Sequence, residues 1–200
     1  LLSAPDDASP FELFGLEEAY AVDEADLEKR LRRLTRLTHP DFFGGKPAEE
    51  RERAERNTAL LNRAHRLLSE PGRRASWLVE RHGGPAEAQE RTMPQAFLME
   101  VLEWNETLDA ARGAAPGGPE RAALDGLESA LAAERTAVQA RIASLLDELP
   151  PRDIADLTAA RRELNALRYL DKTLADIGAL RLAQAAGHAR ARPRTTADRG

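Results

Sequence analysis

The sequence contains no cysteine, so it has no disulfide framework, no thiol nucleophile and no thiolate metal site. Aromatic residues make up only 4% of the chain, and β-branched residues are also scarce. Proline and glycine gather between segments of regular apolar spacing rather than inside them. This composition favours an all-α protein.

Several functional classes also lack their usual signals. No apolar run approaches the length that spans a bilayer, and the net charge of −5 argues against a general nucleic-acid-binding protein. The chain has no glycine loop that cradles phosphate and no sequence context of a nucleophile elbow or a catalytic triad. No two of its four histidines have a metal-ligand spacing with a supporting acid. We therefore expect no catalytic residue, no cofactor and no metal site.

The central feature of the sequence is a basic helix that ends in a His-Pro-Asp turn. Asp23 is a suitable N-cap for a helix that reaches Thr38. One side carries Leu27, Leu31, Leu34 and Thr38, and the opposite side carries the cations Lys29, Arg32, Arg33 and Arg36. Pro40 ends the helix because it has no N–H and disfavours an α conformation in the preceding residue. His39 and Asp41 are therefore predicted to lie on a rigid corner that contacts a partner protein.

Shorter elements are predicted on both sides of this helix. The apolar cluster 11–16, closed by Gly15, is typical of a single helical turn. Pro47 suits the first turn of a helix over 47–69, whose four-three apolar spacing is typical of antiparallel packing against another helix. Ser69 is expected to cap a last short helix, which has Pro71 in its first turn and ends at 82–84.

The second half of the chain is predicted to be a separate helical bundle. Residues 83–92 resemble a short linker, and helical patterns follow over about 94–112, 120–148 and 152–186. Short connections between three helices favour an up-down-up bundle, which we assign to 93–186. Residues 1–9 are expected to be a disordered lead-in, and 187–200 a flexible tail.

The predicted helix 94–112 has apolar residues on two faces. Its core face is Phe97, Val101, Trp104 and Leu108. A second apolar stripe, formed by Leu98, Met99 and Leu102, points away from that face and lies beside the acids Glu103 and Glu106. Two interpretations have comparable support: the stripe docks a partner, or the N-terminal domain covers it. Tyr169 extends the stripe only if the first and third helices of the bundle are neighbours.

The order of these elements carries a resemblance to a known family. Residues 10–82 resemble a J-domain, the module that stimulates ATP hydrolysis by chaperones of the DnaK/HscA class. The segments 11–16, 74–78, 97–103 and 167–172 are similar to those of HscB-type J-protein co-chaperones of iron–sulfur cluster assembly. The resemblance covers about 10–180. Phe42 replaces the basic residue that usually follows His-Pro-Asp, and Ala110 replaces an acid.

The resemblance implies a fold, two partners and a role for each surface. The fold is a J-domain, with an antiparallel helix pair and short flanking helices, joined to a three-helix bundle in an L-shaped arrangement. His39, Pro40 and Asp41 would contact the ATPase domain of the chaperone, and the four cations of the basic helix would meet an acidic surface there. An iron–sulfur scaffold protein of the IscU type would bind Leu98, Met99, Leu102, Glu103, Glu106 and Tyr169.

The resemblance also implies that the protein is a bacterial cytoplasmic adaptor and not an enzyme, with no membrane or nucleic-acid partner. Two alternatives remain open. One is a J-protein that serves a different client. The other is a helical protein that binds nucleic acid through the segment 29–36, which the acidic balance of the rest of the chain disfavours.

Overall fold

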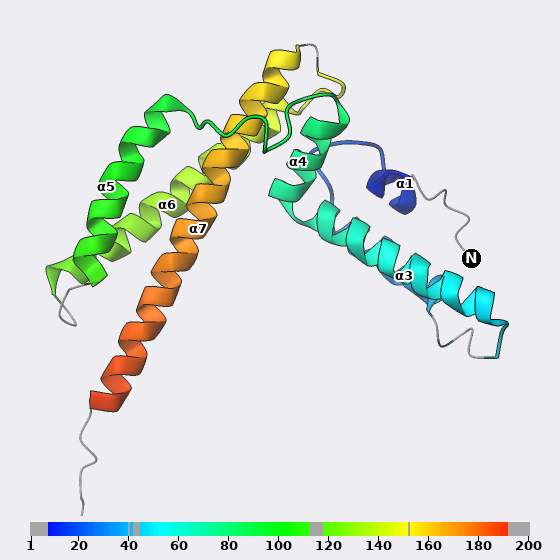
Figure 1. The fold of residues 1–200 in the computed structure, drawn as a ribbon, viewed down its shortest axis with the longest axis horizontal. Helices are drawn as coiled ribbons and strands as arrows, with labels where there is room; N and C mark the ends of the chain where they lie inside the picture. The colour runs from blue at the N-terminus through cyan, green and yellow to red at the C-terminus, as the bar shows by residue number, and fades with distance from the viewer. Residues whose placement is uncertain (1–7, 40, 42–44, 113–117, 152, 192–200) are drawn as a thin grey trace, which may run out of the picture. The chain divides into compact units, whose positions relative to one another are not determined.

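The structure is a computed structural model that describes residues 8–39, 41, 45–112, 118–151 and 153–191, without the side chains of 187–191. These residues form seven helices and no strand, so the predicted all-α class is confirmed (Figure 1). The helices are α1 (Pro10–Phe14), α2 (Glu24–Thr38), α3 (Ala48–Ser69), α4 (Pro71–Arg81), α5 (Gln95–Arg112), α6 (Pro119–Leu145) and α7 (Ile154–Ala191). None of the helices in these ranges is long and apolar enough to cross a membrane.

The helix α1 plugs the core of the N-terminal region. Ser9 and Glu12 form a capping box, in which each side chain accepts a hydrogen bond from the backbone N–H of the other residue. Gly15 ends the helix in the left-handed conformation, with φ 63°, which glycine adopts without a steric cost. Ser9, which was expected to belong to the disordered lead-in, is therefore ordered as the N-cap of α1. Residues 1–7 lie outside the described residues.

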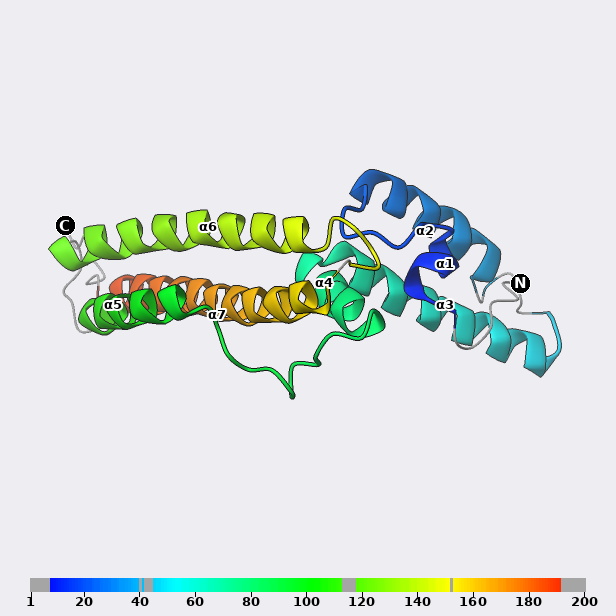
Figure 2. The same cartoon turned by 90° about the horizontal axis from the view of Figure 1, so that it is seen from above.

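The helices α2 and α3 form the predicted antiparallel pair (Figure 2). Asp23 caps α2 as predicted, because its side chain accepts hydrogen bonds from the N–H groups of the first turn. The predicted apolar side of α2 is confirmed, with Leu27 and Thr38 fully buried. Leu27 and Leu34 share a core with residues of α1, α3 and α4, and the burial of this apolar surface is the main force that holds the pair together.

The start of α4 differs from the prediction at one residue. Ser69 is the last residue of α3, and Glu70 takes the N-cap position without a side-chain hydrogen bond. Pro71 stands in the first turn as predicted. The buried Arg74 stabilises the junction between α3 and α4. Its guanidinium donates hydrogen bonds to the backbone carbonyls of Leu68 and Tyr20. Burial lowers the pKa of Arg74, because it disfavours the charged guanidinium. The charge interactions with Tyr20 and Glu24 raise this pKa, but by less.

The chain divides into two compact units, which are Leu1–Arg91 with Gln139–Leu164, and Thr92–Val138 with Asn165–Gly200. The first unit therefore includes the end of α6 and the start of α7. Arg161 on α7 is 2% exposed and donates to the Pro85 carbonyl at 2.9 Å and to the Glu80 carboxylate at 2.8 Å. The domain boundaries expected from the sequence stay a prediction, as does the L-shaped arrangement.

The second unit contains α5 and the adjoining parts of α6 and α7, which lie side by side (Figures 1 and 2). The predicted core face of α5 is confirmed at Phe97, Trp104 and Leu108, which are at most 8% exposed. The Phe97 and Trp104 rings meet edge to face, with centroids 5.3 Å apart. An ion pair between Arg135 of α6 and Asp171 of α7, with 2.6 Å between Nε and Oδ1, joins those helices at the surface.

Candidate functional site

The corner at the end of α2 is exposed to solvent. His39 is the C-cap residue, with extended backbone angles of φ −62° and ψ 127°, so the helix ends at Thr38. The side chains of His39 and Asp41 are 45% and 84% exposed. Pro40 and Phe42 lie outside the described residues. The described part of the predicted corner is therefore accessible to a partner.

Hydrogen bonds hold this corner in a defined geometry. The N–H of Asp41 donates to Nδ1 of His39 at 3.3 Å, and the same Nδ1 lies 3.4 Å from Oδ2 of the Asp41 carboxylate. The carbonyl of Thr38 accepts a hydrogen bond from the Thr58 hydroxyl of α3 at 3.1 Å. Because α3 is anchored in the core, this bond attaches the corner to the rigid part of the unit. Sequence reasoning missed this role of Thr58.

The four predicted cations of α2 are exposed and lie together. Together with Asp26 and Arg30 they line a shallow pocket with a volume of about 490 Å³. Within the described ranges, none of the four cations forms an ion pair with an acidic side chain. Leu37, at the same end of α2 as His39, is 60% exposed. We call this surface, formed by Lys29, Arg32, Arg33 and Arg36, the basic face.

Arg30 lies among these cations but has a structural role that sequence reasoning missed. Its Nε is 2.6 Å from Oδ2 of Asp26. Its Nη1 donates to the backbone carbonyls of Phe14 and Gly15, each at 2.9 Å. These carbonyls stand at the C-terminal end of α1, where carbonyl groups lack partners within the helix. Arg30 therefore ties α2 to α1.

The second apolar stripe of α5 is exposed in the structure. Leu98, Met99 and Leu102 are 44%, 68% and 61% exposed, whereas the core face of the same helix is buried. The carboxylates of Glu103 and Glu106 are also exposed beside them. The surface is therefore apolar with an acidic margin. Exposed apolar side chains clustered in this way are typical of a protein-docking surface.

Tyr169 of α7 lies next to α5, which the sequence alone left open. Its hydroxyl is 3.1 Å from Oδ1 of Asn105, and its ring stands edge to face with Phe97 at a centroid distance of 6.0 Å. The sequence did contain a signal that places Asn105 on the same side of the helix as the stripe, because Asn105 continues the four-three spacing of Leu98 and Leu102. We call Leu98, Met99, Leu102, Glu103, Glu106 and Tyr169 the α5 surface.

The described residues offer no metal site, because they contain no group of three or more His, Asp or Glu side chains able to hold a metal ion. The basic face and the α5 surface instead have opposite characters, one cationic and one apolar with acids. Both arrangements suit contacts with proteins.

Comparison with known proteins identifies the family of the chain. The family described as HSCB C-terminal oligomerisation domain matches residues 93–178. The "Co-chaperone protein HscB homolog" of Bordetella avium is 33% identical over 171 residues, which cover 85% of this chain and 95% of the relative. This chain belongs to the HscB family. The resemblance expected from its motifs is therefore confirmed.

Other members of the HscB family agree in sequence and in structure. The human "Iron-sulfur cluster co-chaperone protein HscB" is 31% identical over 172 residues, which cover 84% of this chain and 67% of the human protein. "Chaperone HscB from Vibrio cholerae" matches with a TM-score of 0.72 at 25% identity, over 88% of this chain and 99% of that one. The crystal structure of human HscB matches with a TM-score of 0.76 at 27% identity, over 92% and 87% of the two chains. The fold is thus an HscB fold.

Proposed function

We propose that the chain is a co-chaperone of iron–sulfur cluster assembly, which binds an IscU-type scaffold protein and presents it to an ATP-driven chaperone of the DnaK/HscA class. Membership of the HscB family carries this proposal, because a human member matched over most of this chain is named an iron–sulfur cluster co-chaperone. The sequence likeness to bacterial relatives supports a role in the bacterial cytoplasm.

The His-Pro-Asp corner and the basic face form the proposed contact with the chaperone. Side chains without acidic partners of their own are available to an acidic surface, and their attraction speeds encounter. The exposed His39 and Asp41 then bind one conformational state of the chaperone better than the other. Only such a difference in affinity shifts the chaperone toward hydrolysis.

The α5 surface forms the proposed contact with the scaffold protein. Binding would remove the apolar surface of Leu98, Met99 and Leu102 from water, which favours association. The unbranched Met99 side chain adapts to an irregular partner surface. Glu103 and Glu106 provide charges at the margin that select the partner and its orientation.

An adaptor with these two surfaces needs no chemistry of its own. Binding the scaffold and the chaperone to one chain raises the effective concentration of the scaffold at the chaperone. The ATP is hydrolysed by the chaperone, and the adaptor changes only how its states are populated. The proposal therefore assigns no catalytic residue and no cofactor to this chain.

The direct test measures ATP hydrolysis by a purified chaperone of this class, with the chain alone and with the chain plus scaffold protein. We expect the chain to stimulate hydrolysis, and the scaffold protein to increase the stimulation further. Absence of stimulation in both mixtures would contradict the proposal. Stimulation by the chain without any binding of scaffold protein would instead favour a J-protein for another client.

A further inference from the structure

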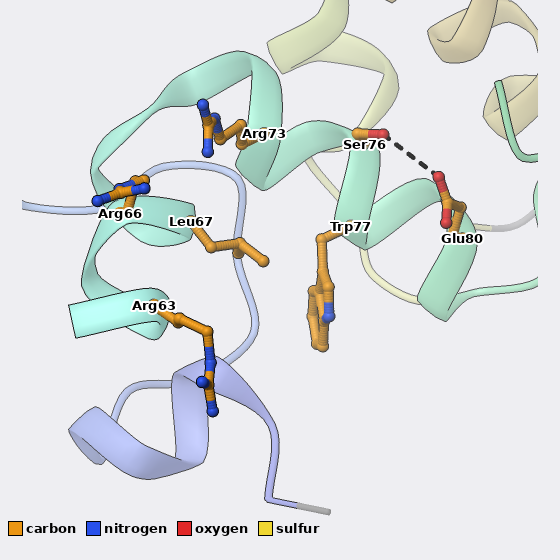
Figure 3. Close-up of a pocket in the computed structure, with 7 residues that line it drawn as sticks. All are labelled: Arg63, Arg66, Leu67, Arg73, Ser76, Trp77 and Glu80. Atoms are coloured by element: carbon orange, nitrogen blue, oxygen red, sulfur yellow. Dashed lines mark hydrogen bonds between the residues drawn. The ribbon is translucent and has the colours of Figure 1, made fainter. Parts of the chain in front are cut away.

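The elbow between α3 and α4 contains a pocket that neither proposed docking surface uses. Its volume is about 510 Å³ (Figure 3). Three cations line it, Arg63 and Arg66 from α3 and Arg73 from α4. Its apolar wall is made by Leu67 and Trp77, and the Leu67 side chain points toward Trp77. We call this site the elbow pocket.

Packing against the core fixes the apolar wall of the elbow pocket. Trp77 is half-buried, and its ring lies 5.5 Å from the Phe11 ring of α1, centroid to centroid. Leu67 packs against the same core. Among the residues the structure describes, the indole N–H of Trp77 has no hydrogen-bond acceptor, so this donor is available to a ligand. A rigid aromatic wall with a free donor loses little entropy when a ligand binds.

The charges of the elbow pocket are not balanced. Arg63 and Arg66 form no ion pair with any acid in the described part of the chain. Arg73 pairs with Glu70, with 2.5 Å between Nε and Oε2. The acid at the opposite rim, Glu80, is held by Arg161 at 2.8 Å. Arg63 and Arg66 therefore line the pocket without a counter-charge from the residues that the structure describes.

We propose that the elbow pocket docks an acidic segment of a partner protein that carries an apolar side chain. The carboxylates would pair with Arg63 and Arg66, because the planar guanidinium binds carboxylate through two parallel hydrogen bonds. The apolar side chain would lie against Leu67 and Trp77. Tryptophan and arginine together are the residues that most often dominate the binding energy of protein interfaces. A small anion would contact only the arginines and would leave Leu67 and Trp77 without a contact.

The test measures fluorescence anisotropy of a fluorescein-labelled hexapeptide, EDLLDE, titrated with the full chain at low salt. We expect saturable binding, and we expect Arg63→Glu with Arg66→Glu to weaken it by about tenfold or more, since both carboxylate partners become repulsive. The matched control is Arg51→Glu with Arg53→Glu, which changes two exposed cations of the same helix and the net charge by the same amount. The control is expected to change binding by no more than about twofold.

Three outcomes would overturn the proposal. The first is the absence of saturable binding of the hexapeptide at millimolar concentrations of the chain. The second is an equal loss of affinity in the pocket variant and in the control, which would mean that the attraction is non-specific. The third is tighter binding of a labelled dT12 oligonucleotide with the same sensitivity to Arg63 and Arg66, which assigns the pocket to nucleic acid. Circular dichroism checks that each variant folds, and Arg63→Gln with Arg66→Gln replaces the pocket variant if it does not.

Discussion

His39 and the arginines of α2 differ in the contacts that their side chains make. Arg30 bonds to Asp26 and to two carbonyls of the α1 end, whereas Arg33 makes no ion pair among the described residues. His39 accepts a hydrogen bond from the backbone of Asp41 but keeps its side chain half exposed. At the residue scale, the contacts of each side chain separate a structural role from the proposed docking role.

Replacing the imidazole at the corner tests the docking role of His39. We expect His39→Gln to reduce stimulation of the chaperone's ATP hydrolysis to the background rate. The free energy of unfolding should change by no more than about 0.5 kcal/mol, because the side chain is exposed. The ATPase rate and urea unfolding measure the two effects. Full stimulation by this variant would contradict the role given to the corner.

A matched pair of arginine variants separates the two roles on α2. Arg30→Met should destabilise the fold by about 1–2 kcal/mol, because two backbone carbonyls and Asp26 lose a charged donor. Arg33→Met should leave stability unchanged and raise the concentration of chain needed for half-maximal stimulation of the chaperone. Urea unfolding and ATPase titration distinguish the variants. An equal effect of both on stability would show that the contacts of Arg30 are not what holds α1.

The helix α5 carries both a buried core face and an exposed apolar stripe, which is the proposed docking surface. Its buried face includes the Phe97 and Trp104 rings, which pack edge to face. Its exposed stripe contains Met99, which is 68% exposed. A helix that is apolar on two faces would normally be buried on both. At the element scale, the exposed stripe is therefore a feature that packing within the described unit does not explain.

Shortening the exposed stripe should affect binding but not folding. We expect Leu98→Ala with Met99→Ala and Leu102→Ala to weaken scaffold binding by about tenfold or more, since apolar area leaves the interface. Helicity should hold, because alanine favours helices. Calorimetric titration measures affinity and circular dichroism measures helicity.

The control for the stripe is Leu182→Ala, which removes the same kind of side chain from α7 at a position that is 74% exposed. It should leave scaffold affinity unchanged. A large loss of stability in the triple variant, or an unchanged affinity, would mean that the stripe packs against the protein itself.

At the scale of the whole molecule, the N-terminal helices and parts of α6 and α7 form one compact unit. Besides the bonds of Arg161, the segment after α4 approaches α7 closely. A Cβ placed on Gly84 would lie 2.7 Å from Cβ of Leu157 and 2.9 Å from the carbonyl oxygen of Val79. Only glycine permits this approach without a shift of the backbone.

A pair of glycine variants tests how far the unit depends on this contact. Gly84→Ala should destabilise the unit by about 1–3 kcal/mol through overpacking. Gly126→Ala on α6 meets nothing within 4 Å and should stabilise its helix by up to about 1 kcal/mol. Hydrogen exchange should quicken in α4 and at the start of α7 only in the first variant. Similar exchange in both variants would contradict the close contact.

The sequence by itself determined the features that depend on neighbouring residues. The N-cap at Asp23, the apolar side of α2 and the glycine end of α1 follow from local hydrogen bonding and helical periodicity, and the structure confirms them. Ser69 failed as a cap because α3 continues through it, and a capping residue does not show by itself where the preceding helix ends. The family motifs were also local, and the comparisons confirm the family that they indicated.

Only the tertiary structure decided which distant segments meet. Arg161 forms hydrogen bonds with Pro85 and Ser76, which precede it in the sequence by 76 and 85 positions. Tyr169 bonds to Asn105, which precedes it by 64 positions. Periodicity shows which face of a helix is apolar, but it does not show which other element covers that face. The same limit hid the elbow pocket, because its arginines and its tryptophan belong to two helices whose crossing is set by the packing of the core.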